Sequence, residues 1–142
     1  MNVRKLTIKE YDEIVKLWSR ANLPFKPQGR DSRDALRVQL KANPDFFLGT
    51  FVHNHLVGTV VMSCDTRKGW INRLAVDPDH RKSGIAKALI AESEKILRKR
   101  GIRIFCALIE EYNVASKKLF KECGYVEHHD ILYFSKRDSD EI

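Results

Sequence analysis

The chain has 142 residues, which is the size of one domain and enough to bury a core without disulfide or metal staples. Its composition, 43% hydrophobic and 32% charged, is ordinary for a soluble globular protein. The 26 Lys and Arg outnumber the 19 Asp and Glu, so the net charge is +7. This balance favours a polyanionic partner: nucleic acid, an acidic membrane surface or a phosphorylated cofactor. Because the cations are spread along the chain and form no basic arm, a plain solvated surface remains the alternative.

Three cysteines, Cys64, Cys106 and Cys123, are odd in number, far apart and set in apolar stretches. This pattern predicts buried free thiols in a reducing cytosol. The first ten residues show no apolar signal core. Residues 46–64 lack Lys, Arg, Asp and Glu, but two glycines and the polar run His53-Asn54-His55 favour a hairpin over a membrane span. We therefore expect a cytoplasmic protein without a membrane partner.

The N-terminal third of the chain predicts one strand and two helices. Residues 3–8 have the pattern of a short strand, and Thr7 with Glu10 forms a T-x-x-E capping box that opens a helix. A polar loop follows Leu23-Pro24, and residues 32–43 predict a second, weaker helix. The first helix has an apolar face at helical spacing, formed by Tyr11, Ile14, Val15, Trp18 and Ala21.

The middle of the chain predicts three strands and a long helix. Two apolar strands, 46–53 and 56–64, are joined by a short turn, and residues 69–77 form the next strand. A helix over residues 84–100 follows, with an apolar face and a glycine after its last turn.

The C-terminal part begins with an apolar strand over residues 102–109 that is rich in β-branched residues. Asn113 then caps another helix, and two short strands, 125–128 and 131–135, precede an acidic tail. The complete order is β-α-α-β-β-β-α-β-α-β-β. We expect one α/β domain over residues 1–142, with a mixed central sheet.

Residues 69–109 form a β-α-β unit, so its two strands should run parallel with a right-handed crossover. Ligands of such sheets bind beyond the carboxyl ends of the strands, where a helix N-terminus points. Residues 81–86 occupy that place. A ligand site is therefore expected at the start of the long helix.

The hexapeptide at residues 81–86, RKSGIA, fits the pattern R-x-x-G-x-A. The first N–H groups of a helix lack internal partners, and the helix dipole adds positive charge, so an anion is favoured there. Gly84 would admit a phosphate oxygen without a Cβ in the way, and Ala86 keeps the next turn slim. The two cations add charge, and the serine either caps the helix or donates its hydroxyl. The alternative is an ordinary helix start with two surface cations.

Two known phosphate-binding motifs do not fit this loop. A Walker-type P-loop requires G-K-[ST], which does not occur in the sequence. A dinucleotide fingerprint requires three glycines, and the loop has only one.

The segment LAVDPDHRKSGIAKAL, residues 74–89, resembles motif A of the GCN5-related N-acetyltransferases, whose Q/R-x-x-G-x-G/A loop binds the pyrophosphate of acetyl-CoA. A second segment, NVASKKLFKECGYVE over residues 113–127, resembles the later N-x-x-A…LY-x-x-x-GF segment of that family. The order and spacing of both segments agree with the family, as does the strand and helix order of nearly the whole chain. Within the family, the chain looks most like small single-domain members related to ribosomal-protein acetylases.

The resemblance implies acetyl-CoA as a cosubstrate and no metal. The backbone of residues 74–76 would pair with the pantetheine arm, and the amides of residues 82–87 would surround the pyrophosphate. Strands 69–77 and 102–109 would splay apart to admit the arm, beside which Asn113 would donate a hydrogen bond. The implied cofactor-binding residues are Leu74, Ala75, Val76, Arg81, Lys82, Ser83, Gly84, Ile85, Ala86, Lys87, Asn113 and Phe120.

The sequence departs from the family pattern at two positions. Phe120 stands where many members carry a tyrosine that protonates the leaving thiolate, and Asn72 stands where some carry a glutamate that takes the proton of the amine. Neither side chain can do acid-base chemistry, while a backbone N–H near Leu74 is the candidate donor to the developing oxyanion. The catalytic base is left unassigned, because the nearby candidates resemble solvated loop residues: Glu110, Glu111, Tyr112 and Asp65.

The resemblance thus implies an N-acetyltransferase in which a primary amine attacks the thioester directly. A missing base matters more for a lysine-like amine (pKa about 10.4) than for an α-amine (about 7.7–8.0), which favours an α-amine acceptor on a small molecule, peptide or protein. A non-catalytic acyl-CoA sensor is the alternative, since it would share the loop and lack acid and base. A nucleic-acid module would explain the charge, but the chain has no RNP-like aromatic strand. Monomer and homodimer both remain open.

Overall fold

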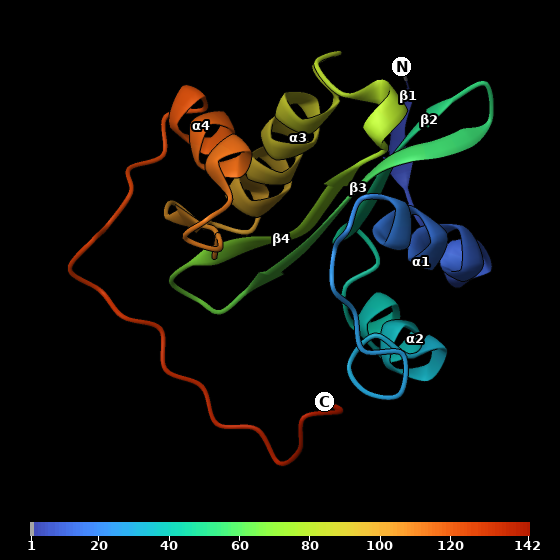
Figure 1. Cartoon of the computed structure of the whole chain (residues 1–142), viewed down its shortest axis with the longest axis horizontal. Coiled ribbons are helices and arrows are strands. Elements are labelled where there is room, and N and C mark those ends of the chain that lie inside the picture. Colours follow the sequence, from blue (N-terminus) through green and yellow to red (C-terminus); the bar gives the residue numbers. More distant parts are fainter. Residues whose placement is uncertain (1) are drawn as a thin grey trace.

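A five-stranded sheet in the order β1-β2-β3-β4-β5 forms the centre of the computed structural model, which describes residues 2–142 (Figure 1). The first three strand pairs are antiparallel, and β4 and β5 are parallel, as the β-α-β unit predicted. The mixed α/β sheet expected from the sequence is confirmed. The strands are β1 (Asn2–Lys5), β2 (Phe47–Val52), β3 (His55–Cys64), β4 (Gly69–Val76) and β5 (Phe105–Cys106).

Four helices accompany the sheet, at the places that the sequence predicted. They are α1 (Tyr11–Arg20), α2 (Arg33–Ala42), α3 (Ile85–Lys99) and α4 (Val114–Glu122), with short 3-10 turns at Ile8–Glu10 and Pro78–His80. The predicted capping box is present, because the Glu10 carboxylate accepts a hydrogen bond of 2.7 Å from the Thr7 N–H. It closes the 3-10 turn that leads into α1.

Two adjacent residues of β3 show how the helices divide between the two faces of the sheet. A Cβ added at Gly58 would lie 2.7 Å from the Ile85 side chain of α3. The hydroxyl of Thr59 accepts a hydrogen bond of 3.0 Å from the Trp18 indole N–H of α1. Neighbouring residues of a strand point to opposite faces, so α3 and α1 cover opposite faces. Figure 1 shows α4 beside α3 and α2 beside α1.

β4 carries a bulge that turns it away from β5. Thr59 pairs with Ala75, whereas Val61 pairs with Asn72, so β4 has one residue more than β3 over this stretch. Arg73, within the bulge, has a φ of +53°, which non-glycine residues rarely adopt. An extra residue of this kind bends and twists the strand that carries it.

Because of this bend, β4 and β5 pair only where they begin. The parallel register joins Gly69 to Phe105 and Trp70 to Cys106, and β4 continues to Val76 without a further partner on that side in the described chain. The predicted splaying of the two strands is therefore confirmed. The strand predicted over residues 102–109 is reduced to two residues, since a strand forms only where a neighbour supplies hydrogen bonds.

The two strands predicted at residues 125–128 and 131–135 do not form. After α4 the chain continues as an extended tail that runs clear of the sheet and ends beside the loop between α1 and α2 (Figure 1). There Arg30 donates a hydrogen bond of 2.8 Å to the Ile142 carbonyl. The tail keeps the apolar pattern that predicted strands, but it has no strand beside it in the described chain.

Two further expectations concern membranes and thiols. The longest helix described between residues 2 and 142 is α3, with 15 residues, and none is long and apolar enough to cross a membrane. The three cysteines are free, as expected, but they are half-buried rather than fully buried.

Candidate active site

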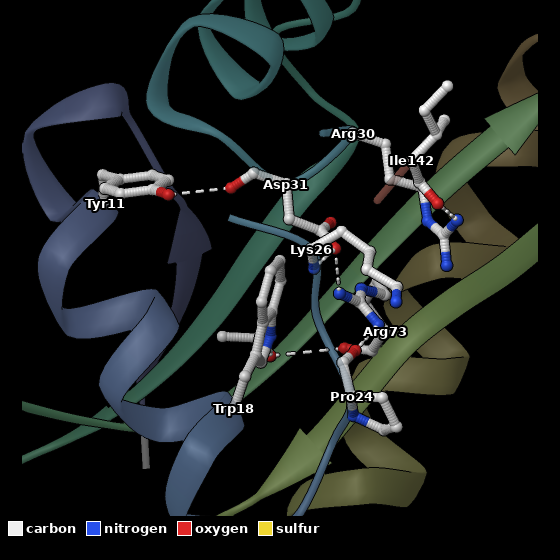
Figure 2. Close-up of polar contacts among 9 residues, drawn as sticks. Tyr11, Trp18, Pro24, Lys26, Arg30, Asp31, Arg73 and Ile142 are labelled. Carbon is white, nitrogen blue, oxygen red and sulfur yellow. Dashed lines mark hydrogen bonds and ion pairs between the residues drawn. The ribbon is translucent and has the colours of Figure 1, made fainter. Parts of the chain in front are cut away.

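The bulge in β4 is held by the side chain of Arg73 (Figure 2). Its guanidinium lies 2.7 Å from the Asp31 carboxylate and donates a second hydrogen bond to the Pro24 carbonyl. The same group lies 4.4 Å from the centre of the Trp18 ring, a favourable cation–π distance. On the backbone, the Thr59 hydroxyl lies 3.3 Å from the Arg73 carbonyl. Arg73 therefore joins the bulge to α1 and to the loop that follows it.

Asp31 anchors the other end of this contact. Its carboxylate is buried and also accepts a hydrogen bond of 2.7 Å from the Lys26 N–H, while its carbonyl accepts one of 2.8 Å from the Tyr11 hydroxyl. Burial lowers the pKa of the Arg73 guanidinium, and the Asp31 charge opposes that change. Because the ordinary pKa of arginine is above 12, the pair stays ionic. It fixes the loop over residues 22–32 against β4.

The loop at residues 77–84 joins the end of β4 to α3. The Asp77 carboxylate accepts a hydrogen bond of 2.9 Å from the Asp79 N–H and pairs with Arg20 of α1 at 3.0 Å. These contacts lower the pKa of the Asp77 carboxyl, and the hydrogen bond from the Asp79 N–H has the largest effect. The following backbone is left-handed at Lys82 (φ +62°) and at Gly84 (φ +84°), which is the N-cap of α3. The loop thus begins at Asp77, whose carboxylate is held by a hydrogen bond and an ion pair, and ends at Gly84.

The loop leaves a row of donors without protein partners. Between residues 2 and 142, no hydrogen bond is donated by the backbone N–H groups of residues 82–87. A Cβ placed on Gly84 would meet no atom within 4 Å, so this residue borders open space. The Ser83 hydroxyl donates to the His80 carbonyl and does not cap the helix. Unpartnered amides at a helix N-terminus are well suited to an anion.

The cations around this loop differ in how far they are paired. Arg81 and Lys82 are exposed and form no ion pair within the described chain. Lys87 pairs with Glu122 of α4 at 2.7 Å, and this contact raises the pKa of Lys87 and lowers that of Glu122. The pair links the first turn of α3 to the last turn of α4.

The other residues expected at the site lie on β4 and α4. Leu74 and Val76 are half-buried and Ala75 is buried. Asn113 is the N-cap of α4, and its side-chain oxygen accepts a hydrogen bond of 3.1 Å from the Ser116 N–H. Phe120 is 5% exposed and packs edge-on against Tyr125, with ring centres 5.0 Å apart.

Tyr125 fastens the end of α4 to α3. Its hydroxyl donates a hydrogen bond of 2.7 Å to the Glu94 carboxylate. Burial raises the pKa of the Tyr125 hydroxyl far above its ordinary value, and the Glu94 carboxylate adds a smaller effect in the same direction. A phenol held so firmly in its neutral form is a structural hydrogen-bond donor.

Of the candidate bases at the ends of the strands, Asp65 is poorly suited to take a proton. The Asp65 carboxylate accepts hydrogen bonds of 2.7 and 2.6 Å from the Lys68 and Arg67 amides, which lower its pKa. Asn72 donates a hydrogen bond of 3.2 Å to the Ser63 hydroxyl and has no titratable group. The remaining candidates, Glu110, Glu111 and Tyr112, are exposed in the loop before α4. Among residues 2–142, no group of three or more His, Cys, Asp or Glu side chains is placed to hold a metal ion.

Arg73 and Asp31 were missed by the sequence analysis. An arginine inside the largely apolar strand GWINRLAV was a visible signal, because a charge in a covered strand needs a partner. Its partner lies 42 residues away in the sequence, in a polar loop that has no pattern of its own.

The chain belongs to the GNAT family of acetyltransferases. The model of the "Acetyltransferase (GNAT) family" matches residues 11–125, which include both segments that carried the resemblance up to Tyr125. An acetyltransferase of Photorhabdus laumondii is 33% identical over 138 residues, covering 96% of this chain and 95% of that protein. The protein is therefore an acetyl-CoA-dependent N-acetyltransferase by family.

Three solved structures show the same fold. The aminoglycoside 6′-N-acetyltransferase AAC(6′)-Ig of Acinetobacter haemolyticus has a TM-score of 0.77 at 21% identity, covering 98% of this chain and all of that one. The PaiA N-acetyltransferase of Thermoplasma acidophilum, in complex with coenzyme A, has a TM-score of 0.72 at 23% identity (86% and 87% covered). The Escherichia coli ribosomal-protein-S18-alanine N-acetyltransferase has a TM-score of 0.71 at 17% identity (89% and 78% covered).

We expect Arg73→Ala to destabilise the protein strongly, because it leaves the buried Asp31 carboxylate without its counter-ion. Breaking a buried pair costs about 3–5 kcal/mol. We expect a loss of stability near the lower end of this range, because the Arg73 side chain is 20% exposed. Thermal melts of Arg73→Ala, Asp31→Asn and the double variant measure the coupling between the two residues. The double variant should lose clearly less than the sum of the single losses. Strictly additive losses would show that the contact contributes little.

Proposed function

We propose that this enzyme transfers an acetyl group from acetyl-CoA to the α-amino group of a small molecule, peptide or protein, and that residues 74–76 and 82–87 hold the donor. The observation that carries the proposal is the combination of a loop of unpartnered amides with a strand that separates from its parallel neighbour. The first feature suits a pyrophosphate, and the second suits an extended arm with amide groups of its own.

The loop supplies the contacts for the pyrophosphate. The N–H groups of residues 82–87 are free to donate, and the missing side chain of Gly84 lets an oxygen reach them. Arg81 and Lys82 add unpaired positive charge, which strengthens hydrogen bonds to a phosphate. Ile85, only 3% exposed, anchors the loop in the core, and the small Ala86 leaves room along the first turn.

β4 supplies the contacts for the pantetheine arm. Beyond Trp70, the β5 side of β4 has no strand partner in the described chain, so the backbone groups of Leu74, Ala75 and Val76 can pair with the amides of the arm as a neighbouring strand would. The side-chain NH₂ of Asn113 has no partner between residues 2 and 142, because only its oxygen is used in capping α4. It is therefore free to donate a hydrogen bond to the arm.

The chemistry requires few groups from the protein. Acetyl-CoA, when bound, supplies an activated thioester that a neutral amine can attack. The bulge at Arg73 turns the backbone at Leu74 out of the regular β3–β4 ladder, and a Leu74 N–H directed at the thioester oxygen would stabilise the charge that develops there. The Arg73–Asp31 pair holds this backbone in place. Neither Asn72 nor Phe120 can take or give a proton.

The lack of a base at Asn72 favours an α-amine over a lysine side chain. The ordinary pKa values are about 7.7–8.0 and about 10.4, so at neutral pH the neutral fraction of the α-amine is roughly 200- to 400-fold larger. The relatives named above act on different acceptors according to their names. None of them is similar enough to carry its acceptor to this chain.

Turnover of acetyl-CoA tests the function directly. Peptides with a free N-terminus are expected to be acetylated faster than the same peptides with a blocked N-terminus and a single lysine. Aminoglycosides and polyamines complete the panel. If acetyl-CoA binds in calorimetry but no amine is acetylated, the protein is an acyl-CoA sensor and the catalytic proposal is wrong.

Gly84→Val is expected to weaken acetyl-CoA binding at least about tenfold, or 1.4 kcal/mol, because its side chain enters the space of the phosphate oxygens. Calorimetric titration with CoA measures the change. Gly101→Val is the matched control, because Gly101 has the same φ of +84° and the same open surroundings but lies at the other end of α3.

Both valine variants should lose similar stability from backbone strain, and only Gly84→Val should lose affinity. Equal affinity in the two variants would refute the pyrophosphate site.

Phe120→Tyr tests whether this position lies beside the reacting sulfur. A positioned acid is typically worth about 10²–10⁴-fold, but only when proton transfer limits the rate. Since a thiolate leaves well without help, we expect a gain in kcat of only a few-fold. Phe120→Leu, which removes the ring but stays apolar, should raise the KM for acetyl-CoA. Wild-type kinetics in both variants would mean that Phe120 is ordinary core.

A further inference from the structure

We propose that Trp70 sets the acceptor preference of this enzyme, by binding a large apolar side chain on the second residue of a peptide or protein N-terminus. This role rests on the proposed function, because it requires the amine to attack the thioester beside Leu74. It adds the class of acceptor and the residue that recognises it.

Three side chains lie side by side on the face of the sheet that α1 partly covers. In the register of the sheet, Ser63 of β3 lies opposite Trp70 of β4, and Trp70 lies opposite Cys106 of β5. Ser63 is four residues from Thr59, which bonds to α1, so all three side chains point to that face. We call this row, Ser63, Trp70 and Cys106, the Trp70 platform.

The helices stop short of the Trp70 platform. Along the same face, Thr59 and Val61 are buried, at 0% and 8% exposure, but Ser63 is exposed. Trp70 and Cys106 are half-buried, and neither packs against the hydrophobic core of the described chain. The platform is therefore a piece of sheet surface that lies outside the core.

The two tryptophans of the chain differ in what they do for the fold. Trp18 is 1% exposed and donates its indole N–H to the Thr59 hydroxyl, so it belongs to the core. Within residues 2–142, Trp70 donates no hydrogen bond from its indole and has no aromatic ring packed against it. A large ring outside the core with an unused donor is suited to a ligand, and tryptophan is enriched among the residues that dominate binding surfaces.

The surface of the platform is uncharged. Burial raises the pKa of the Cys106 thiol, which therefore stays neutral beside the ring, and the charges of Lys68 and Asp65 act on this thiol in opposite directions. A neutral cysteine behaves as a small apolar group. Ring and thiol together favour an apolar side chain over a charged one.

The Trp70 platform lies beside the gap proposed for the pantetheine arm. β4 and β5 pair at Trp70 and separate beyond it, so the platform marks the closed end of this gap. Because α3 covers the opposite face, the acceptor reaches the gap from the face that carries the platform. Asn72 also lies on this face, half-buried and hydrogen-bonded to Ser63, between Trp70 and the backbone of Leu74. An amine that attacks beside Leu74 is therefore next to Asn72.

The spacing along β4 assigns the platform to the second residue of the acceptor. Alternate residues of a strand are about 6.4–6.8 Å apart, which is the separation expected between Asn72 and Trp70. In a peptide the α-nitrogen and the Cα of the second residue are at most about 5 Å apart. A large side chain on that Cα spans the remaining distance to the ring, whereas glycine does not reach it.

Three peptides with free N-termini test this preference: Ala-Leu-Gly-Gly, Ala-Gly-Gly-Gly and Leu-Gly-Gly-Gly. Wild type is expected to acetylate the first with a kcat/KM at least about tenfold above that of the second, through a lower KM. One methylene in an enclosed apolar pocket is worth about 10–200-fold, and the platform is more open. The third peptide should gain less, because its leucine is on the first residue.

Substitutions at Trp70 locate the source of the preference. Trp70→Ala should bring the first two peptides within about twofold of each other and leave the affinity for CoA unchanged, while Trp70→Phe should keep most of the preference. Phe105→Leu is the matched control, because Phe105 lies beside Cys106 but faces α3, where Arg98 is 4.8 Å from its ring centre. This variant should keep the wild-type preference. Thermal melts should show little loss of stability for Trp70→Ala, since its ring lies outside the core.

A preference that follows the first residue, or one that Trp70→Ala leaves at its wild-type value, would overturn the proposal. A loss of stability typical of a core tryptophan would overturn it too.

Calorimetric titration of the same peptides into the CoA-bound enzyme separates this proposal from the proposed function, because it requires no turnover. If the Ala-Leu peptide binds at least about tenfold more tightly than the Ala-Gly peptide, and Trp70→Ala removes the difference, the role of Trp70 holds even when no peptide is acetylated. In that case only the catalytic proposal fails. If peptides are acetylated and bound without regard to their second residue, the catalytic proposal holds and the role of Trp70 is refuted.

Discussion

The contact between Arg73 and Asp31 is the constraint on which the site geometry depends. It fixes a non-glycine residue at a φ of +53° in the middle of β4, where the strand gains its extra residue. A residue in that conformation persists only when its surroundings hold it there. The ion pair, the Trp18 ring and the Pro24 carbonyl provide that support. The resulting bend separates β4 from β5 and opens the edge proposed to take the pantetheine arm.

Most of the fold could be predicted because its signals are local. Alternation in the strands, the capping box before α1 and the glycine-marked start of α3 each lie within a few residues. The loop proposed to bind the pyrophosphate was predicted in the same way, since its chemistry resides in consecutive amides. The Arg73–Asp31 pair was missed because it joins residues 42 positions apart, and no local pattern encodes such a distance.

The C-terminal strands were predicted wrongly for a different reason. The apolar residues at 131–134 do have the composition of a buried strand, but a strand also requires a hydrogen-bonded neighbour, and sequence patterns say nothing about its presence. β5 was predicted too long for the same reason, because its partner bends away after Trp70. In both cases the sequence pattern identified a segment that tends to form a strand, but it did not show whether a neighbouring strand is present to pair with it.

The packing of Ile85 on Gly58 has a consequence for how the enzyme meets its cosubstrate. Ile85 directly follows Gly84 and packs against Gly58, where β3 has no side chain. The end of the loop is therefore anchored in the core before any ligand arrives. A binding loop that is held by core packing before the ligand arrives loses less conformational entropy on binding than a mobile loop would. For the pyrophosphate proposed to bind these amides, most of the affinity should thus appear as net binding, and association should be fast because no loop has to close first.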